Sequence, residues 1–379
     1  MDPNQVLCVL PLTHAARIAK RIDMLQEAGF KVEAVAFERD YVGGRLPDCP
    51  IQLMGTLSHG RLLLRTLKLL KSVLKVRAAM RRHDMVHAFS PDMALLALVS
   101  GLGLGKPVAV EVADIREAQT AKGLKGLVVR VMDKFTVNRC HMLIVTSEHY
   151  FRYYRDWLRV SRPGLVLENK LNASFCDEVR AVATPEVPVL ALQDRPLRIG
   201  WFGRLRDEWS LRVVDALTRL PQSRISFVIA GSLSLSVDDL PQLLSDNSGI
   251  EFLGPYNHPE DLPSLYNKVD MVLACRPPDV PSCWSRTNRY YDACYFQKPL
   301  IVRAGCADAD ETARYGIGLV IEDESPEGAA AAIRGITTVD LHRWRANMRA
   351  LPQTVFTNHG DTGKLGLAMT KMADGTLTE

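Results

Sequence analysis

The stretch SRTNRYYDACYFQKPLIV, residues 285–302, contains a polar loop, a helix and a buried strand in direct succession. Thr287 and Asn288 are residue types whose side chains cap the free N–H groups at a helix start. Asn288 and Asp292 are four residues apart, so they share one face of that helix. A proline then ends the helix, and the apolar run after it predicts a strand. The free N–H groups at such a helix start suit a phosphate, and the nearby carboxylate suits a ligand hydroxyl. The alternative is a surface helix with an ordinary cap.

Length and composition indicate a globular protein of two domains. The chain has 379 residues, of which 47% are hydrophobic and 24% are charged, and this is too long for one typical core. The net charge of +4 does not indicate nucleic-acid binding. The eight cysteines form no CxxC pair, so we expect reduced thiols without a zinc site or a disulfide framework. The N-terminus does not resemble a signal peptide, and no apolar run reaches membrane-span length; we therefore expect a cytoplasmic location.

Apolar runs alternate with helical patterns along the whole chain. The expected strands cover residues 5–12, 31–37, 51–55, 85–90, 107–114, 141–148, 164–172, 197–205, 224–231, 250–255, 271–275, 299–305 and 317–323. This alternation predicts an α/β protein with doubly wound parallel sheets. Three prolines in 183–196 indicate a linker, so we expect an N-terminal domain over 1–182, a C-terminal domain over 197–345 and a helical tail over 346–379.

Several polar residues come at the ends of the expected strands of the N-terminal half. His87, Asp114, Ser147 and Asn169 are the candidates. Doubly wound sheets bind ligands beyond the carboxyl ends of their strands, and two such halves predict a ligand cleft between them. We therefore expect His87, Ser147 and Asn169 to line this cleft, and Asp114 to act in catalysis or in binding a substrate there. The alternatives are a capping role for Asp114 and a purely structural role for His87.

The segment 60–83 is a predicted helix with eight Lys and Arg residues and no acid. Leucines lie between the basic positions, so the helix is amphipathic. We expect it to contact an anionic membrane surface, with basic side chains at the lipid headgroups. The alternative is a solvated basic face on a helix that packs on the core. The basic side chains assigned to the membrane surface are Arg61, Arg65, Lys68, Lys71 and Lys75.

The order of these motifs resembles the GT-B glycosyltransferases, and among them the retaining family 4 enzymes. The C-terminal half carries most of the resemblance, through GWFGRL, FVIAGSLS, TNRYYDACYFQKPLIV and RYGIGLVIEDESPEGAAAAI. VHAFSPDMALLA and VAVEVADIRE resemble weaker signatures of the N-terminal half. The resemblance implies two Rossmann-like domains that face a cleft. It implies that the N-terminal domain binds the acceptor, that the C-terminal domain binds a nucleotide sugar, and that the tail packs back on the N-terminal domain.

The resemblance also implies the donor-binding residues. Glycine at 203 lets the backbone approach the diphosphate, and Arg204 stabilises the charge that develops on it during catalysis. Arg206 can take the place of a lysine that the family has at the position of Trp209. In the helix that follows the polar loop, Asn288 and Arg289 would lie near the diphosphate, and Asp292 would hold the ribose. The donor would be a UDP- or GDP-sugar, with no cofactor and no metal ion.

The resemblance predicts transfer of a hexose to a glycan or a polyprenyl-linked acceptor. Together with the basic helix, it suggests polysaccharide or glycolipid biosynthesis by a peripheral enzyme on the inner face of the cell membrane. Trp284 stands where the family often has an acid. This departure leaves open a catalytically degenerate partner subunit, and a nucleotide-sugar epimerase is a further alternative.

Overall fold

The chain forms two compact units. The computed structural model describes residues 4–38, 46–56, 62–173, 176, 195–205, 207–219, 224–232, 247–258, 260–278 and 281–378. The first unit contains Met1–Glu168 and Gly360–Glu379, and the second contains Asn169–His359. The expected boundary at 182 lies outside the described residues, as does most of the expected linker 183–196.

The chain enters the second unit earlier than we expected. Residues just after Glu168 are hydrogen-bonded to a segment near 357. Leu171 forms a parallel bridge with Thr357, and the side-chain oxygen of Asn358 accepts a hydrogen bond from the Ala173 N–H at 3.0 Å. These bonds attach the residues that follow Glu168 to the second unit.

The first unit is built on a seven-stranded sheet in which every neighbouring pair is parallel. The strand order is β3-β2-β1-β4-β5-β6-β7. The central strands β1, β4, β5 and β6 are almost completely buried, as is expected when helices cover both faces of a parallel sheet. The strands are β1 (Gln5–Leu10), β2 (Lys31–Glu38), β3 (Ile51–Thr56), β4 (Met85–Phe89), β5 (Val108–Val112), β6 (Met142–Val145) and β7 (Gly164–Val166).

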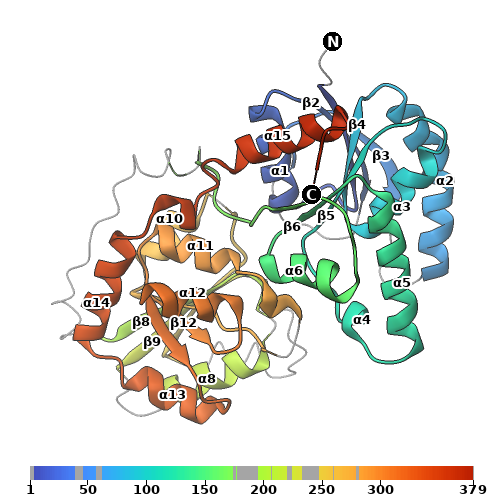
Figure 1. Ribbon diagram of the computed structural model, residues 1–379. Helices are drawn as coiled ribbons and strands as arrows, with labels where there is room; N and C mark the ends of the chain where they lie inside the picture. Colours follow the sequence, from blue (N-terminus) through green and yellow to red (C-terminus); the bar gives the residue numbers. More distant parts are fainter. Residues whose placement is uncertain are drawn as a thin grey trace. The chain divides into compact units, whose positions relative to one another are not determined.

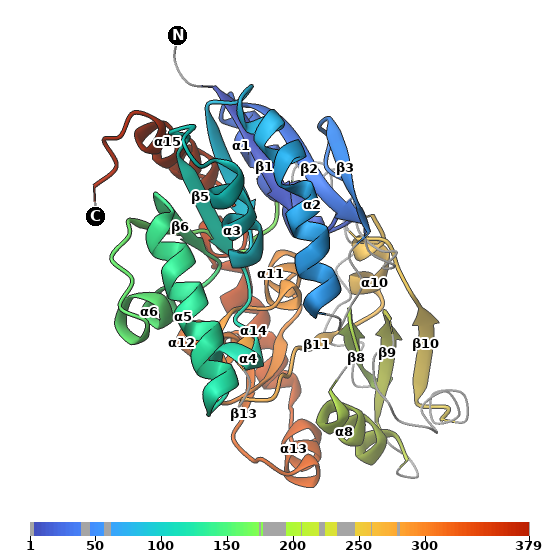
Figure 2. The same ribbon diagram turned by 90° about the vertical axis from the view of Figure 1, so that its right-hand side faces the viewer.

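Helices cover both faces of this sheet (Figure 1). The helices of the first unit are α1 (Ala16–Glu27), α2 (Leu62–Met80), α3 (Pro91–Ser100), α4 (Glu117–Thr120), α5 (Leu124–Arg139), α6 (Glu148–Arg152), the π-helix η1 (Tyr153–Trp157) and α15 (Asp361–Ala373). Helices α1 and α15 pack together on one face. On the other face α3 contacts both α2 and α5, and Figure 2 shows these three helices side by side.

The helical tail is divided between the two units. Helix α15 packs on α1, and Leu365, Met369 and Met372 join the core that contains Ile18 and Ile22. Residues 360–379 therefore belong to the first unit, whereas the earlier part of the expected tail, residues 346–359, belongs to the second.

The second unit contains a six-stranded sheet, also parallel throughout. Its order is β10-β9-β8-β11-β12-β13. The strands are β8 (Leu197–Phe202), β9 (Ile225–Ala230), β10 (Ile250–Gly254), β11 (Met271–Leu273), β12 (Leu300–Arg303) and β13 (Gly318–Ile321).

Two apolar clusters pack on the faces of this second sheet. Helices α8 and α13 contribute to one cluster, α10, α11 and α12 contribute to the other, and α14 contributes to both. The helices of the second unit are α8 (Glu208–Thr218), α10 (Leu262–Asn267), η3 (Pro281–Trp284), α11 (Asn288–Tyr295), α12 (Ala307–Tyr315), α13 (Pro326–Arg334), α14 (Thr338–Arg349) and η4 (Gln353–Val355).

Candidate functional site

The second sheet has its topological switch point between β8 and β11. The chain runs from β8 to β9 and β10 on one side, and from β11 to β12 and β13 on the other. A crevice forms at such a point, outside the carboxyl ends of the two strands, and ligands of open α/β sheets bind there. The expected donor residues come from the segments that follow β8 and β11.

The segments after β8 and β9 each place a glycine, and so backbone without a side chain, near this crevice. Gly203 has φ of +104°, and its N–H donates to the Ala230 carbonyl at 2.9 Å. Gly231 follows β9 with φ of +142°, and a Cβ at this position would lie 1.6 Å from the Gly203 carbonyl oxygen. Only glycine fits there, because the two backbone turns touch. Arg204 comes next and is exposed, whereas Arg206 lies outside the described residues.

Helix α11 begins close to the carboxyl end of β11. The Thr287 hydroxyl caps the helix by accepting from the Tyr290 N–H at 3.0 Å. The Thr287 N–H itself donates to the buried Asp308 carboxylate at 2.9 Å. Arg289 donates from Nη1 to the Leu273 carbonyl, at the last residue of β11, at 3.0 Å. The start of α11 is thus anchored at the strand next to β8.

Two arginines, Arg276 and Arg289, concentrate positive charge near the start of α11. Burial lowers the pKa of Arg289, and the neighbouring Arg276 guanidinium lowers it further. Burial raises the pKa of Asp308, although both arginines and the Thr287 hydrogen bonds oppose the shift. Two guanidinium groups that destabilise each other beside one carboxylate form a site that an anion would stabilise.

Asp292 lies one turn further along α11 in an unusual environment. Its side chain is 4% exposed, and its Oδ1 atom has no hydrogen-bond partner among the described residues. The His258 ring lies beside it, with Nε2 3.8 Å from Oδ1. Burial and then the Asp292 carboxylate raise the pKa of Tyr256, and the same two causes raise that of Tyr266. A buried carboxylate oxygen without a donor is costly unless a ligand supplies the hydrogen bond.

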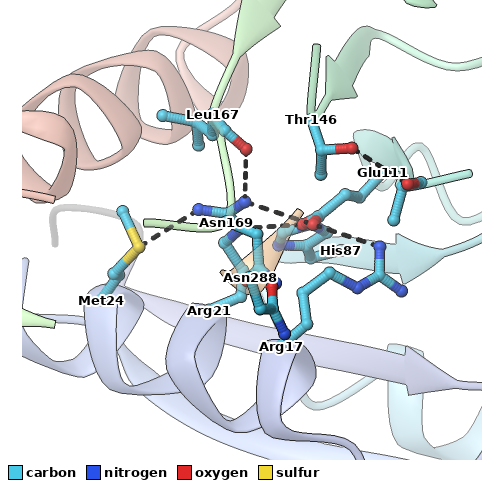
Figure 3. A network of polar contacts seen from close by, with 10 residues as sticks. Arg17, Arg21, Met24, His87, Glu111, Thr146, Leu167, Asn169 and Asn288 are labelled. Atoms are coloured by element: carbon cyan, nitrogen blue, oxygen red, sulfur yellow. Dashed lines mark hydrogen bonds and ion pairs between the residues drawn. The ribbon is translucent and has the colours of Figure 1, made fainter. Parts of the chain in front are cut away.

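Asn288 makes a contact that sequence spacing did not indicate. Its Oδ1 accepts from Nδ2 of Asn169 at 2.5 Å (Figure 3). We assigned Asn169 to the N-terminal domain, but it belongs to the second unit. The structure therefore brings Asn169 to the start of α11, with the expected donor residues.

The first unit contains a buried charge network around Glu111, the fourth residue of β5 (Figure 3). Arg21 donates from Nε to Oε2 at 3.0 Å and from Nη2 to Oε1 at 3.3 Å. His87 Nε2 lies 3.1 Å from Oε2, and Arg17 Nη1 lies 3.8 Å from Oε1. Burial alone would raise the pKa of Glu111, but Arg21, His87 and Arg17 together hold it well below its usual range.

The expected acceptor residues of the first unit have different environments. His87 is completely buried within the Glu111 network. Ser147 is buried and caps α6 by accepting from the His149 N–H at 3.1 Å. Asp114 is exposed and accepts a hydrogen bond from the Tyr150 hydroxyl at 3.1 Å. Of these three residues, only Asp114 is exposed and so open to a ligand.

Sequence reasoning missed two participants in these environments. His258 lies in the loop after β10, 34 residues before Asp292, and no local pattern connects the two. The position of Arg21 could have been predicted from the sequence. Arg17 and Arg21 are four residues apart and alternate with Ile18 and Ile22, so two cations flank the buried face of α1.

The basic helix is only partly described. Lys71 and Lys75 are exposed on α2, and Lys68 donates to the Thr56 carbonyl at 2.5 Å. Arg61 lies outside the described residues, and so does the side chain of Arg65. Within the described ranges, no helix has the length and hydropathy needed to cross a bilayer. The same ranges contain no cluster of His, Cys, Asp or Glu side chains arranged to hold a metal ion.

Comparison with solved structures shows the fold. Sucrose-phosphate synthase from Thermosynechococcus elongatus matches with a TM-score of 0.74 at 14% identity, over 98% of this chain and 100% of that one. HepE from Anabaena, in complex with UDP and glucose, matches with a TM-score of 0.68 at 15% identity, over 97% of this chain and 99% of that one.

Sequence comparison identifies relatives of the chain. Residues 13–169 match the family model of the glycosyl transferase 4-like domain. The succinoglycan biosynthesis protein ExoL of Rhizobium meliloti is 28% identical over 305 residues, which cover 76% of this chain and 73% of that protein.

With both sheets and these relationships established, the class of the protein follows. The chain is a GT-B glycosyltransferase, as the order of its motifs indicated. The match to the glycosyl transferase 4-like domain lies in the first unit, except for its last residue, Asn169.

Proposed function

We propose that this glycosyltransferase moves a hexose from a UDP- or GDP-sugar to a glycan or lipid-linked acceptor, with retention of anomeric configuration. The observation that carries the proposal is the buried Asp292 carboxylate, whose Oδ1 lacks a hydrogen-bond donor among the described residues. A ribose hydroxyl supplies such a donor. The UDP bound to HepE supports a uridine nucleotide as the first candidate.

The groups at the switch point suit a nucleoside diphosphate. The touching turns at Gly203 and Gly231 leave the backbone without side chains, so phosphate oxygens can approach closely. Arg276 and Arg289 supply the positive charge, and the exposed Arg204 can reach the leaving phosphate. Charge stabilisation of this kind is worth most where it is fixed before the reaction begins.

The transfer itself needs few groups from the protein. The bond from the anomeric carbon to the phosphate oxygen breaks, and its electron pair stays on the diphosphate. The acceptor oxygen bonds to the same face of the anomeric carbon, and its proton passes to the leaving phosphate. Positioning and charge stabilisation supply most of the rate in such a mechanism. In the first unit, Asp114 is the group we assign to orienting the acceptor hydroxyl, because its carboxylate is exposed.

The acceptor and the location remain part of the proposal. The name of the succinoglycan biosynthesis relative supports a role in polysaccharide biosynthesis. The exposed Lys71 and Lys75 on α2 support contact with an anionic membrane, on its cytoplasmic face, where a polyprenyl-linked acceptor would be found.

Nucleotide binding tests the proposal most directly. We expect UDP or GDP to raise the melting temperature of the wild type, and Asp292→Asn and Arg204→Ala to reduce that shift. Asp340→Asn is the matched control, since this carboxylate lies on α14 and hydrogen-bonds its own N-cap residue. If none of UDP, GDP and ADP stabilises the wild type, the donor site proposed here does not exist.

Incubation with a panel of UDP- and GDP-sugars separates the possible activities. A transferase hydrolyses its donor slowly without an acceptor, an epimerase returns an isomer, and a partner subunit gives neither product. Trp284, in the place of the usual acid, is the observation that keeps the partner subunit in the comparison. Proton NMR of the first sugar released or transferred then reads its anomeric configuration, and inversion would contradict the proposed mechanism.

A further inference from the structure

Helix α5 carries its large apolar side chains on the outside of the molecule. Six of them are between 49% and 76% exposed. At 3.6 residues per turn they fall within an arc of about 140°, so they form one continuous stripe along the helix. The residues of this stripe are Leu124, Leu127, Val128, Val131, Met132 and Phe135.

The opposite face of α5 is the one that packs on the protein, and it is poor in apolar groups. Its buried residues are Gly126, Asp133, Thr136 and Val137. Gly126 lies so close to the chain that a Cβ there would be 2.0 Å from the Ala121 carbonyl oxygen. Asp133 accepts a hydrogen bond from Gln119 inside the fold. The helix is therefore oriented opposite to the usual rule, in which the apolar stripe faces the core.

Contiguous exposed apolar surface of this kind marks an interaction site. The charges around the stripe identify its partner. Lys125 and Lys134 are exposed on its two flanks, and Arg139 lies at its end with its guanidinium 4.7 Å from the centre of the Phe135 ring. The acid of this helix, Asp133, points inward. A partner must therefore be apolar at its centre and negative on both sides.

An anionic bilayer has this arrangement, with hydrocarbon below and phosphate headgroups around the inserted side chains. A second copy of the chain does not, since pairing two such stripes would bring rows of cations together. Trp157, in the adjoining π-helix η1, is 53% exposed, and the Arg130 guanidinium lies 5.9 Å from its ring centre. Tryptophan with an arginine beside it is typical of the membrane–water interface.

Other parts of the same helical layer agree with this assignment. Helix α3 lies between α2 and α5 on one face of the sheet (Figure 2). Leu102, just after α3, is 70% exposed, and Leu74 on α2 is 76% exposed. Leu74 lies between the exposed Lys71 and Lys75, so α2 repeats the pairing of apolar and basic side chains on a smaller scale.

We propose that the apolar stripe of α5, with Trp157 beside it, inserts into the headgroup region of an anionic membrane and is the main membrane-docking surface of the protein. The inference deepens the proposed function, on which it rests only for the location of the acceptor. It changes the assignment made from the sequence, in which the basic residues of α2 alone contact the membrane.

Vesicle flotation tests the proposal. The full chain is mixed with vesicles of phosphatidylcholine alone, and with vesicles that also contain phosphatidylglycerol. We expect binding to the second kind. The double variant Val131→Asp/Phe135→Asp removes two inserting side chains, each worth about 1.5–3 kcal/mol of burial, so its partition coefficient should fall by about 100-fold or more. Leu367→Asp is the matched control, because Leu367 is 59% exposed on α15, on the other face of the sheet.

Three outcomes would overturn the proposal. The wild type could fail to bind anionic vesicles, or the double variant could bind like the wild type. Alternatively, light scattering could show a wild-type dimer that the double variant converts to a monomer, which would make a second copy the partner. The UDP-induced melting shift is measured on the same samples. If vesicle binding is lost in the variant while no nucleotide stabilises any sample, the docking surface stands and the proposed donor site fails.

Discussion

Replacing Arg21 with methionine tests the buried network around Glu111. The substitution keeps most of the side-chain volume and the contact region near Met24, but it removes both hydrogen bonds from the guanidinium to the carboxylate. Arg21 is 3% exposed and Glu111 is 1% exposed. Water therefore cannot replace the lost partner unless α1, which carries Arg21, moves away from the sheet.

The expected cost follows from this burial. Breaking a buried ion pair from one side costs about 3–5 kcal/mol, because the remaining charge is left uncompensated. For a unit of this size that corresponds to a melting-temperature decrease of about 6–20 °C. Arg17 recovers little of this cost, because its Nη1 lies 3.8 Å from the carboxylate, beyond hydrogen-bond distance.

The measurement must report on the first unit alone. Amide hydrogen exchange in β1 and β5 does so, since both strands lie in the core of that sheet. The double variant Arg21→Met/Glu111→Gln should recover part of the loss, because the buried charge is then absent. Arg152→Met is the matched control in the same unit: its ion pair with Glu148 is exposed on α6, and such pairs contribute about 1 kcal/mol or less.

Two results would refute this reasoning. One is a loss below about 1 kcal/mol in Arg21→Met, which would place the pair in the energetic class of surface ion pairs. The other is a double variant that is no more stable than the single one, which would show that the arginine acts by packing and not by charge.

Three further predictions concern other positions. Gly231→Ala should weaken UDP binding measured by calorimetry, because the new Cβ meets the Gly203 carbonyl and adds about 1–3 kcal/mol of backbone strain; unchanged affinity would show that the Gly203 turn does not hold the donor. Asp133→Asn should stabilise the first unit by up to about 3 kcal/mol at pH 8 and by little at pH 4. The reason is that burial raises the pKa of Asp133 to about 6. At low pH the carboxyl is neutral and its burial costs little, but stability is lost as the pH rises through that value, because the folded state must then hold a buried charge that asparagine does not carry. Thermal melts at both pH values check it, and a difference that does not depend on pH would contradict it. Treatment with EDTA should leave donor hydrolysis unchanged, since we expect no essential metal ion; loss of activity that is restored by Mg²⁺ or Mn²⁺ would contradict this.

The sequence predicted the elements of the fold more completely than the contacts between them. Strands β1 and β8 were visible because central parallel strands are apolar on both faces. The start of α11 was visible because a cap is a local interaction, and Thr287 does cap it. The pairs Asn169–Asn288 and Arg21–Glu111 were not visible, because their partners are brought together only by the packing of distant segments.

Helix α5 shows the same limit. It spans Leu124–Arg139 and contains both apolar and basic residues. Which of its faces would be buried could not be predicted, because a helical pattern indicates an apolar stripe without indicating what covers it. The inward direction of Asp133 depends on Gln119, which belongs to the separate helix α4.

The division of the chain into units has a consequence for its synthesis. The second unit is one continuous segment, Asn169–His359, inserted into the first. The ribosome therefore completes the second unit while the first still lacks α15. Until residues 361–373 are made, the apolar face of α1 around Ile18 and Ile22 has no Leu365 or Met369 to cover it. Domains usually finish folding in the order of their synthesis. Here the unit that begins first is completed last, and a nascent chain stalled before residue 360 would hold a finished second unit beside an open first one.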